Sequence, residues 1–423
     1  MNSAIAAIIG LALAIILIIR KIPPVFALFL GALAGGLLAG WGMVRTVNEM
    51  ISGVKDIVPA IVRILAAGVL SGMLVVTGAA ESISASIVRR LGVQRVYLAR
   101  TLASMLLCAT GVFIDVAVIT IAPIALMIGR RVGAPLPRLM IAMIGGGKCG
   151  NIISPNPNTI IAAENFGAPL QSVMLANLLP ALIGLIITVW LVIPLVPKGK
   201  IVLQAVVADN APDDSHSSPG APLPSFLGSI AGPLLAVVLL ALRPLFGIAI
   251  DPMVALPAGG LLGLVTTRRW KLTLPSLKYG LEKMSGVAVL LVGTGAIAGI
   301  IKASAITTFI VNALGGWSGG GELLAPIAGI LMCAATASTT AGATIASSSF
   351  SDAILAAGVN PVAGAAMVNA GATVLDHLPH GSFFNATGGC VGMSVAERIK
   401  IIPYESLVGI TLTLLSFLAQ HFF

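Results

Sequence analysis

The sequence predicts an all-helical protein that crosses a lipid bilayer roughly ten to twelve times, counting hairpins that turn back inside the membrane. Hydrophobic residues make up 57% of the 423 positions and charged residues only 9%. A soluble domain carries about 25% charged residues, so this chain is solvated mainly by lipid. Several apolar runs approach the roughly 20 residues that a membrane-crossing helix needs. They cover residues 5–19, 22–44, 64–80, 175–196, 230–250 and 407–423.

The formal net charge of +9 comes from basic residues in short segments between the apolar runs, as at Arg89–Arg90 and Arg268–Arg269. Short cytoplasmic loops of membrane proteins carry such an excess, so the charge does not indicate a nucleic-acid partner. The first apolar run has no basic leader and is interpreted as the first helix, not as a cleaved signal. The four cysteines lack metal-ligand spacing and are predicted to be structural thiols, so no metal or cofactor is expected.

One long polar segment, residues 198–225, divides the chain into halves of nearly equal length. Its proline, serine and aspartate content does not suit a packed core, so it is predicted to be an extramembrane linker. Residues 1–197 and 226–423 are then expected to form two transmembrane repeats.

Two polar interruptions lie within apolar, membrane-length sequence. The first break is GGGKCGNIISPNPNT, residues 145–159, and the second break is NAGATVLDHLPHGSFFN, residues 369–385. Hydrocarbon holds no water, so backbone that leaves the helix there must line a cavity or be buried in protein. Such interruptions at corresponding places in two halves indicate a transporter's binding site.

The two breaks align at one offset. Gly147 and Gly371 are 224 positions apart, and so are Pro155 and Pro379. Each half also has an earlier interrupted apolar segment, near residues 111–115 and 337–344. These correspondences predict a duplicated unit that contains one broken helix and one hairpin.

In the first break, Lys148 is expected at a hairpin tip, where its ammonium and nearby backbone N–H groups would bind an anion. The alternative is a lysine whose ammonium reaches back to the membrane interface. The polar side chains that follow could hydrogen-bond substrate hydroxyls or a carboxylate, although turn geometry also explains such a composition. They belong to Asn151, Ser154, Asn156, Asn158 and Thr159.

Asp115 is a lone carboxylate in apolar sequence. Its charge is costly there, which suits reversible protonation. A fixed ion pair, for example with Lys148, is the alternative. Asp376, His377 and His380 form the densest ionisable group in the second break. Asp376 and His377 are candidate proton carriers because histidine titrates near neutral pH. A structural Asp–His hydrogen bond or a metal site is also compatible with this spacing.

Residues 336–351, TASTTAGATIASSSFS, are rich in small and hydroxyl side chains. Small residues allow close helix packing, and hydroxyls beside freed backbone also suit a polyhydroxy ligand. The substrate-binding candidates here and in the second break are Ser338, Thr339, Thr340, Thr344, His380 and Ser382. Glu405 is assigned to a loop or interface.

These motifs resemble those of the gluconate permease family within the ion transporter superfamily. The resemblance runs through residues 111–115 with Pro123, then residues 154–158, 337–344 and 376–384. At each place the sequence departs from the usual family pattern, as in Ile114 before Asp115 and the asparagines of the first break. The chain is therefore similar to a divergent member of this family.

The resemblance implies a secondary transporter, not an enzyme, that carries a small organic anion such as gluconate or another sugar acid together with a proton. It also implies two inverted repeats and a homodimer in the lipid bilayer of the bacterial inner membrane. Three alternatives remain: a sodium-coupled carboxylate carrier of the same superfamily, an intramembrane metalloenzyme using Asp376, His377 and His380, and a passive channel.

Overall fold

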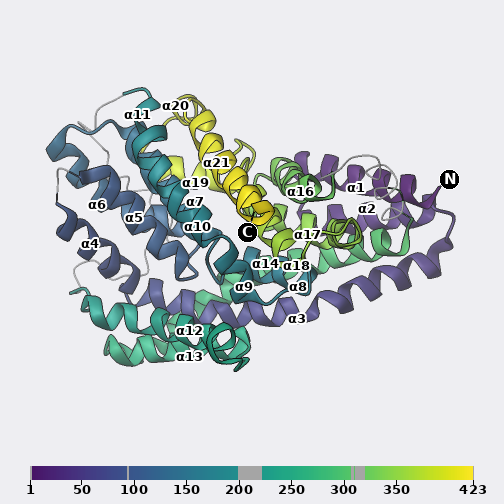
Figure 1. Ribbon diagram of the computed structural model, residues 1–423, viewed down its shortest axis with the longest axis horizontal. Coiled ribbons are helices and arrows are strands. Elements are labelled where there is room, and N and C mark those ends of the chain that lie inside the picture. Colours follow the sequence, from purple (N-terminus) through teal and green to yellow (C-terminus); the bar gives the residue numbers. More distant parts are fainter. Residues whose placement is uncertain (1, 93–94, 199–221, 306–308, 310–319, 423) are drawn as a thin grey trace.

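The computed structural model describes residues 2–92, 95–198, 222–305, 309 and 320–422, and the elements among them are helices (Figure 1). Most of the predicted linker, residues 198–225, lies outside the described residues. Five described helical stretches are long and apolar enough to cross a membrane: Gly42–Val76, Leu170–Leu195, Phe226–Arg243, Trp270–Ala303 and Val395–Phe422. Shorter apolar helices accompany them. The predicted all-helical, multi-span class is confirmed, and the number of crossings stays a prediction.

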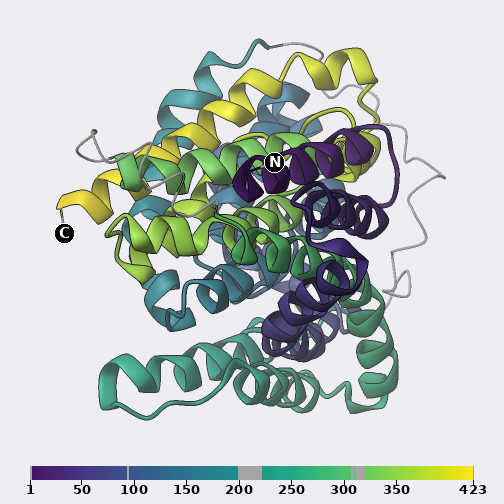
Figure 2. The same cartoon turned by 90° about the vertical axis from the view of Figure 1, so that its right-hand side faces the viewer.

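The two longest described helices, α3 (Gly42–Val76) and α14 (Thr273–Ala303), pack along one another. Four further helices pack on this pair or on one another: α1 (Ser3–Ile19), α2 (Pro24–Leu38), α12 (Phe226–Phe246) and α13 (Pro252–Thr266). Figure 2 shows α12 and α13, in teal, as the outermost layer at the bottom of the view. We call these six helices the α3–α14 group.

Helix α3 begins well before the predicted apolar run 64–80. Its early turns carry charged residues such as Lys55 and Asp56, which lower the local hydropathy but are exposed. The positions that pack inward, including Gly53, Ile57 and Ala60, recur every three or four residues and are buried. The early turns are therefore amphipathic, and a search for continuous apolar sequence misses them.

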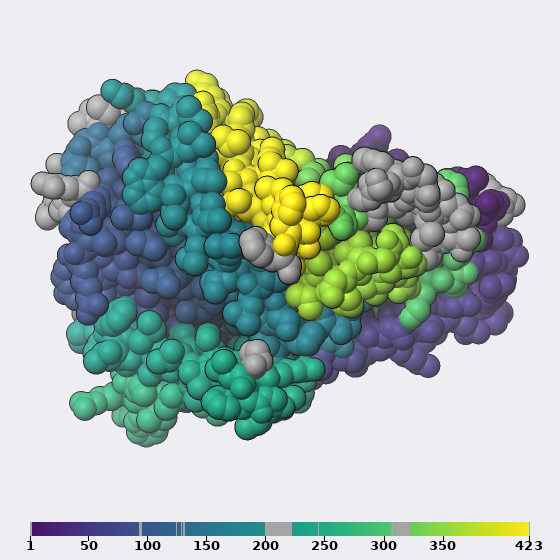
Figure 3. Space-filling view, in the orientation of Figure 1, coloured from purple at the N-terminus to yellow at the C-terminus, as the bar shows by residue number. Residues whose placement is uncertain are grey.

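Most of the other described helices, long and short, form a second group around both breaks. In the first half these are α4 (Ala79–Leu91), α5 (Val96–Ala109), α6 (Ile114–Val132), α7 (Leu136–Asn151), α8 (Pro157–Asn165), α9 (Leu170–Ala176) and α10 (Leu178–Ile187), which continues through Thr188–Val192 and α11 (Ile193–Leu195). In the second half they are α16 (Gly320–Thr336), α17 (Thr339–Ala356), α18 (Pro361–Gly371), α19 (Ser382–Gly389), α20 (Val395–Ile399) and α21 (Ile402–Phe422). The halves interleave: α17 and α18 pack on α8, and α21 packs on α7 and α10. Figure 3 shows the yellow surface of α21 beside the teal surface of α10.

The helices are interrupted at the predicted places. Residues 110–113 separate α5 from α6, and residues 337–338 separate α16 from α17. Within the first break, residues 152–156 separate α7 from α8, and within the second, residues 372–381 separate α18 from α19. Whether the two halves are inverted repeats with re-entrant hairpins stays a prediction.

Candidate functional site

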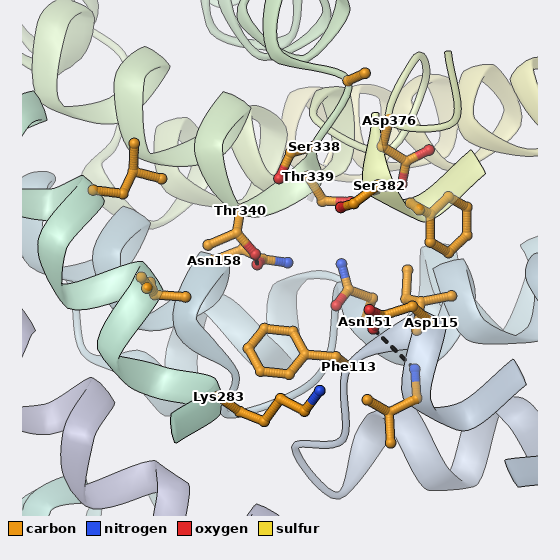
Figure 4. A pocket seen from close by; sticks show the side chains of 17 residues that line it. Phe113, Asp115, Asn151, Asn158, Lys283, Ser338, Thr339, Thr340, Asp376 and Ser382 are labelled. Carbon is orange, nitrogen blue, oxygen red and sulfur yellow. Dashed lines mark hydrogen bonds between the residues drawn. The ribbon is translucent and has the colours of Figure 1, made fainter. Parts of the chain in front are cut away.

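A cavity of about 320 Å³ lies where these interruptions meet (Figure 4). Its polar and charged lining comes from both breaks, from both interrupted helices and from α14. These side chains belong to Asp115, Asn151, Asn158, Lys283, Ser338, Thr339, Thr340, Asp376 and Ser382. Residues from distant parts of the sequence therefore converge on one site.

The glycines of the first break do not interrupt the helix, contrary to expectation. Residues 145–151 continue α7 as helix, and the chain leaves the helix only at residues 152–156. A Cβ on Gly146 would lie 2.0 Å from the carbonyl oxygen of Thr101, and one on Gly150 would lie 2.1 Å from that of Met105. These glycines let α7 approach α5 closely, so Lys148 lies within a helix and not at a hairpin tip.

The turn of the first break is held by its own side chains. Asn156 caps α8, because its Oδ1 accepts a hydrogen bond from the Thr159 backbone N–H at 3.1 Å. Asn156 Nδ2 also donates to the carbonyl oxygen of Asn151 at 2.9 Å. The Asn369 amide donates to Thr159 Oγ1 at 3.1 Å, which joins the two breaks. Asn156 and Thr159 thus support the site from behind, and Ser154 is also buried outside the cavity lining.

Asn151 and Asn158 face the cavity with their amide nitrogens available. Asn151 Oδ1 accepts from Asn156 Nδ2 at 2.5 Å, and Asn158 Oδ1 accepts from Thr340 Oγ1 at 2.7 Å. Both side chains are buried, at 3% and 1% exposure, and both Nδ2 atoms have no hydrogen-bond partner within the described structure. Figure 4 shows these two amide groups turned toward the open space. A buried N–H group without a partner costs free energy, which an acceptor on a ligand would recover.

The interruption between α16 and α17 places three hydroxyl groups on the cavity wall. Ser338 caps α17 by accepting from the Ala341 backbone N–H at 3.3 Å, and Thr339 Oγ1 donates to Asp376 Oδ2 at 2.7 Å. Ala337, which also lines the cavity, has a φ of +47°, an uncommon conformation for a residue with a side chain. Thr344 lies one turn further along α17, outside the lining, and donates to the Thr340 carbonyl oxygen.

Behind this wall, Lys148 forms a buried ion pair with Asp376 of the second break. Lys148 Nζ lies 2.6 Å from Asp376 Oδ1, and the two side chains are 0% and 3% exposed. The ammonium also donates to the Thr373 carbonyl oxygen and lies 3.1 Å from His377 Nδ1. Asp376 reaches the cavity, whereas Lys148 does not line it. Lys148 therefore pairs with Asp376, whereas the sequence suggested Asp115 as its partner.

The ionic cluster continues away from the cavity. His377 Nδ1 lies 3.0 Å from Asp376 Oδ1 and 3.7 Å from Glu405 Oε2. Glu405 is 1% exposed and pairs with the equally buried Arg398. The assignment of Glu405 to a loop or interface is therefore wrong. The interior tolerates its charge because Arg398 neutralises it. His380 is exposed and lies apart from the cavity lining, unlike its neighbour His377.

Two charged residues complete the lining. Asp115 stands at the start of α6, where its Oδ1 accepts from the Val116 backbone N–H at 2.9 Å. Lys283 reaches the cavity from the opposite side, on α14. No sequence signal singled out Lys283, because it lies within one continuous helix, far from both breaks.

A polar cavity between interrupted helices in an all-helical membrane protein is typical of secondary transporters. The chain belongs to the gluconate permease family: the profile of the GntP family permeases matches residues 2–257. An uncharacterized transporter of Haemophilus influenzae is 49% identical over 98% of this chain and 97% of its own length. The high-affinity gluconate transporter of Escherichia coli K12 is 23% identical over 96% and 97%, respectively.

The crystal structure of the Alcanivorax borkumensis YdaH transporter, described as having an unusual topology, has a similar fold. Its TM-score is 0.61 at 16% sequence identity, over 89% of this chain and 87% of that one. The resemblance read from the motifs is thus confirmed. Because the family consists of permeases, the metalloenzyme alternative is set aside.

Proposed function

We propose that the protein is a proton-coupled symporter of a small hydroxylated carboxylate, gluconate or a related sugar acid, in the bacterial inner membrane. The observation that carries this proposal is the pair of unpartnered amide nitrogens of Asn151 and Asn158 beside the cavity hydroxyls. A ligand rich in hydroxyl and carboxylate oxygens supplies the acceptors that these donors lack. The named gluconate transporter among the relatives supports the same substrate class.

Charge balance supports the proton. Around the cavity, the carboxylates of Asp115 and Asp376 are matched by the ammonium groups of Lys283 and Lys148. A monovalent anion would leave one uncompensated negative charge in a site surrounded by apolar helices, which is costly. One proton, taken up by Asp115 or by the Asp376–His377 pair, restores neutrality before the site moves across the membrane.

The surroundings of Lys148 favour a proton over sodium. A sodium ion at the second break would be bound by backbone carbonyls and a carboxylate, as hard cations prefer oxygen ligands. The Thr373 carbonyl oxygen and Asp376 are already engaged by the Lys148 ammonium. This fixed cation occupies the oxygen ligands that a sodium ion would use there.

By analogy with the superfamily, we further propose that residues 1–197 and 226–423 are inverted repeats with re-entrant hairpins, and that the protein is a homodimer. Lys148 would then act on the substrate through Asp376, and Thr344 and His380 would contact it only in another conformation.

The test is uptake of labelled gluconate by proteoliposomes that contain the purified protein. Accumulation should follow an imposed pH gradient and disappear when a protonophore collapses it. Uptake that persists in a sodium gradient without a proton gradient would instead establish the sodium-coupled alternative. A parallel thermal-shift screen with sugar acids, hydroxy acids and D-serine should show stabilisation by the true substrate, since ligand binding stabilises the folded state.

A further inference from the structure

One face of α14 forms the wall of the cavity opposite the breaks. Lys283, Gly286, Val287 and Leu290 line the cavity, and their spacing of three, four and seven positions places them on one side of the helix. Helix α14 packs along α3, whereas the other lining residues come from the helices around the breaks. A bound ligand would therefore contact both helix groups.

We propose that this α14 face selects the substrate: Lys283 binds its carboxylate, and Gly286 leaves the space that sets the substrate's length. This inference rests on the proposed function for the identity of the ligand. It assigns the anion-binding role to a residue outside both breaks.

Lys283 is placed to attract an anion. It carries the only positive charge among the described residues that line the cavity, because the ammonium of Lys148 lies behind the wall. Its Nζ lies 5.5 Å from the centroid of the Tyr279 ring on the preceding turn of α14. Figure 4 shows its nitrogen directed toward the side of the cavity that holds Asp115 and Asn151. A carboxylate in this space would meet the ammonium and the unpartnered Asn151 amide together.

Gly286 lies three residues from Lys283 and borders open space. A Cβ at this position would meet no heavy atom within 4 Å. Gly280 on the same helix differs, since its Cβ would lie 2.0 Å from the Gly68 carbonyl oxygen. Close packing therefore explains Gly280 but not Gly286. Alanine stabilises a helix more than glycine does, so helix stability does not explain Gly286 either. We infer that the absence of a side chain at Gly286 keeps space open in the cavity.

Substrate size tests the role of Gly286. Gluconate, with six carbons, and D-glycerate, with three, each carry one carboxylate and several hydroxyls. In proteoliposomes, Gly286→Val should lower gluconate uptake at least tenfold and glycerate uptake less than threefold. Gly389→Val is the matched control and should leave the ratio of gluconate to glycerate uptake unchanged. A Cβ there also meets nothing within 4 Å, and Gly389 does not line the cavity. Equal losses for both probes, or no loss, would overturn the size role.

Charge-selective labelling tests Lys283 without any substrate. Cys108, Cys149 and Cys333 are buried, so a Cys390→Ala background leaves Gly286→Cys as the reactive site. Anionic and cationic methanethiosulfonate reagents should both reach it. Adding Lys283→Gln should lower the anionic-to-cationic rate ratio by about three- to tenfold, the effect of one nearby charge.

The exposed Lys278, on the same helix but outside the lining, provides the control: Lys278→Gln should leave the ratio unchanged. A Gly286→Cys variant that resists both reagents, or a ratio indifferent to Lys283→Gln, overturns the inference. If the wild-type protein carries neither gluconate nor glycerate, the proposed function fails while the labelling ratio still decides the role of α14.

Discussion

Removal of the buried charges of Lys148 and Asp376, singly and together, tests whether this pair holds the two breaks in place. Nζ and Oδ1 are 2.6 Å apart, and the side chains are 0% and 3% exposed. Loss of one partner from such a pair costs about 3–5 kcal/mol, because the other charge stays buried without compensation.

The local hydrogen bonds rank the two single variants. In Lys148→Gln, Asp376 keeps Thr339 as a donor at 2.7 Å, which places the loss near the lower end of that range. In Asp376→Asn, the ammonium keeps only neutral acceptors, such as the Thr373 carbonyl oxygen and His377 Nδ1, and no anion, so the loss should be larger. The double variant removes both charges. Its loss in the free energy of unfolding should be about 2–3 kcal/mol smaller than the sum of the two single losses.

Equilibrium unfolding of purified protein in mixed detergent, followed by helical circular dichroism, measures these differences. The control cycle uses the exposed pair Lys302–Asp56, at 3.0 Å and 63% and 57% exposure, for which the coupling should stay below about 1 kcal/mol. Strictly additive losses for Lys148→Gln and Asp376→Asn, or single losses below about 1 kcal/mol, would refute the reasoning from burial.

Three further predictions concern individual carboxylates. Asp115→Asn should abolish pH-driven gluconate accumulation while sparing exchange of internal for external substrate; normal accumulation would remove Asp115 from the coupling. Glu405→Gln should destabilise the protein by about 3–5 kcal/mol, because Arg398 stays buried, and an unfolding midpoint equal to wild type would contradict this. The hydrogen bond from Arg63 lowers the pKa of Asp251 below its unfolded value of about 3.9. Ionised Asp251 therefore stabilises the fold above that pH, and the contribution is lost as the pH falls through the lower folded pKa. Asp251→Asn should flatten the acid limb of the stability curve, and an unchanged limb would count against the Arg63 contact.

The fold class was predictable because hydrocarbon imposes a simple rule on sequence. Long apolar runs mark helices, and polar interruptions mark the places where helices end inside the protein. The rule fails for the first turns of α3, because they carry buried small and apolar residues on one side and exposed charged residues on the other, so they form no continuous apolar run. The pairing of α17 with α8 and of α21 with α10 is tertiary, and no local pattern contains it.

The site was predictable to the extent that its chemistry interrupts a helix. Asn151, Asn158 and the hydroxyls of residues 338–340 stand out because such groups are costly in lipid, and the structure places them at one cavity. Lys283 and Gly286 interrupt nothing, so their positions on the cavity follow only from how α14 packs. The prediction that the glycines beside Lys148 end the helix was wrong, because glycine in a membrane helix also allows close packing, as Gly146 and Gly150 do against α5.

The distribution of buried contacts locates the boundary at which the protein can rearrange. Movement of one break against the other would separate Lys148 from Asp376 at a cost of about 3–5 kcal/mol, and would also break the Asn369–Thr159 hydrogen bond. The ion pair between Arg63 of α3 and Glu164 of α8, the helix that follows the first break, is partly exposed and worth about 1 kcal/mol. The two breaks should therefore move as one unit against the α3–α14 group. A substrate held between that unit and the α14 face then loses its Lys283 contact when the unit moves, so binding on one side and release on the other follow from the same displacement.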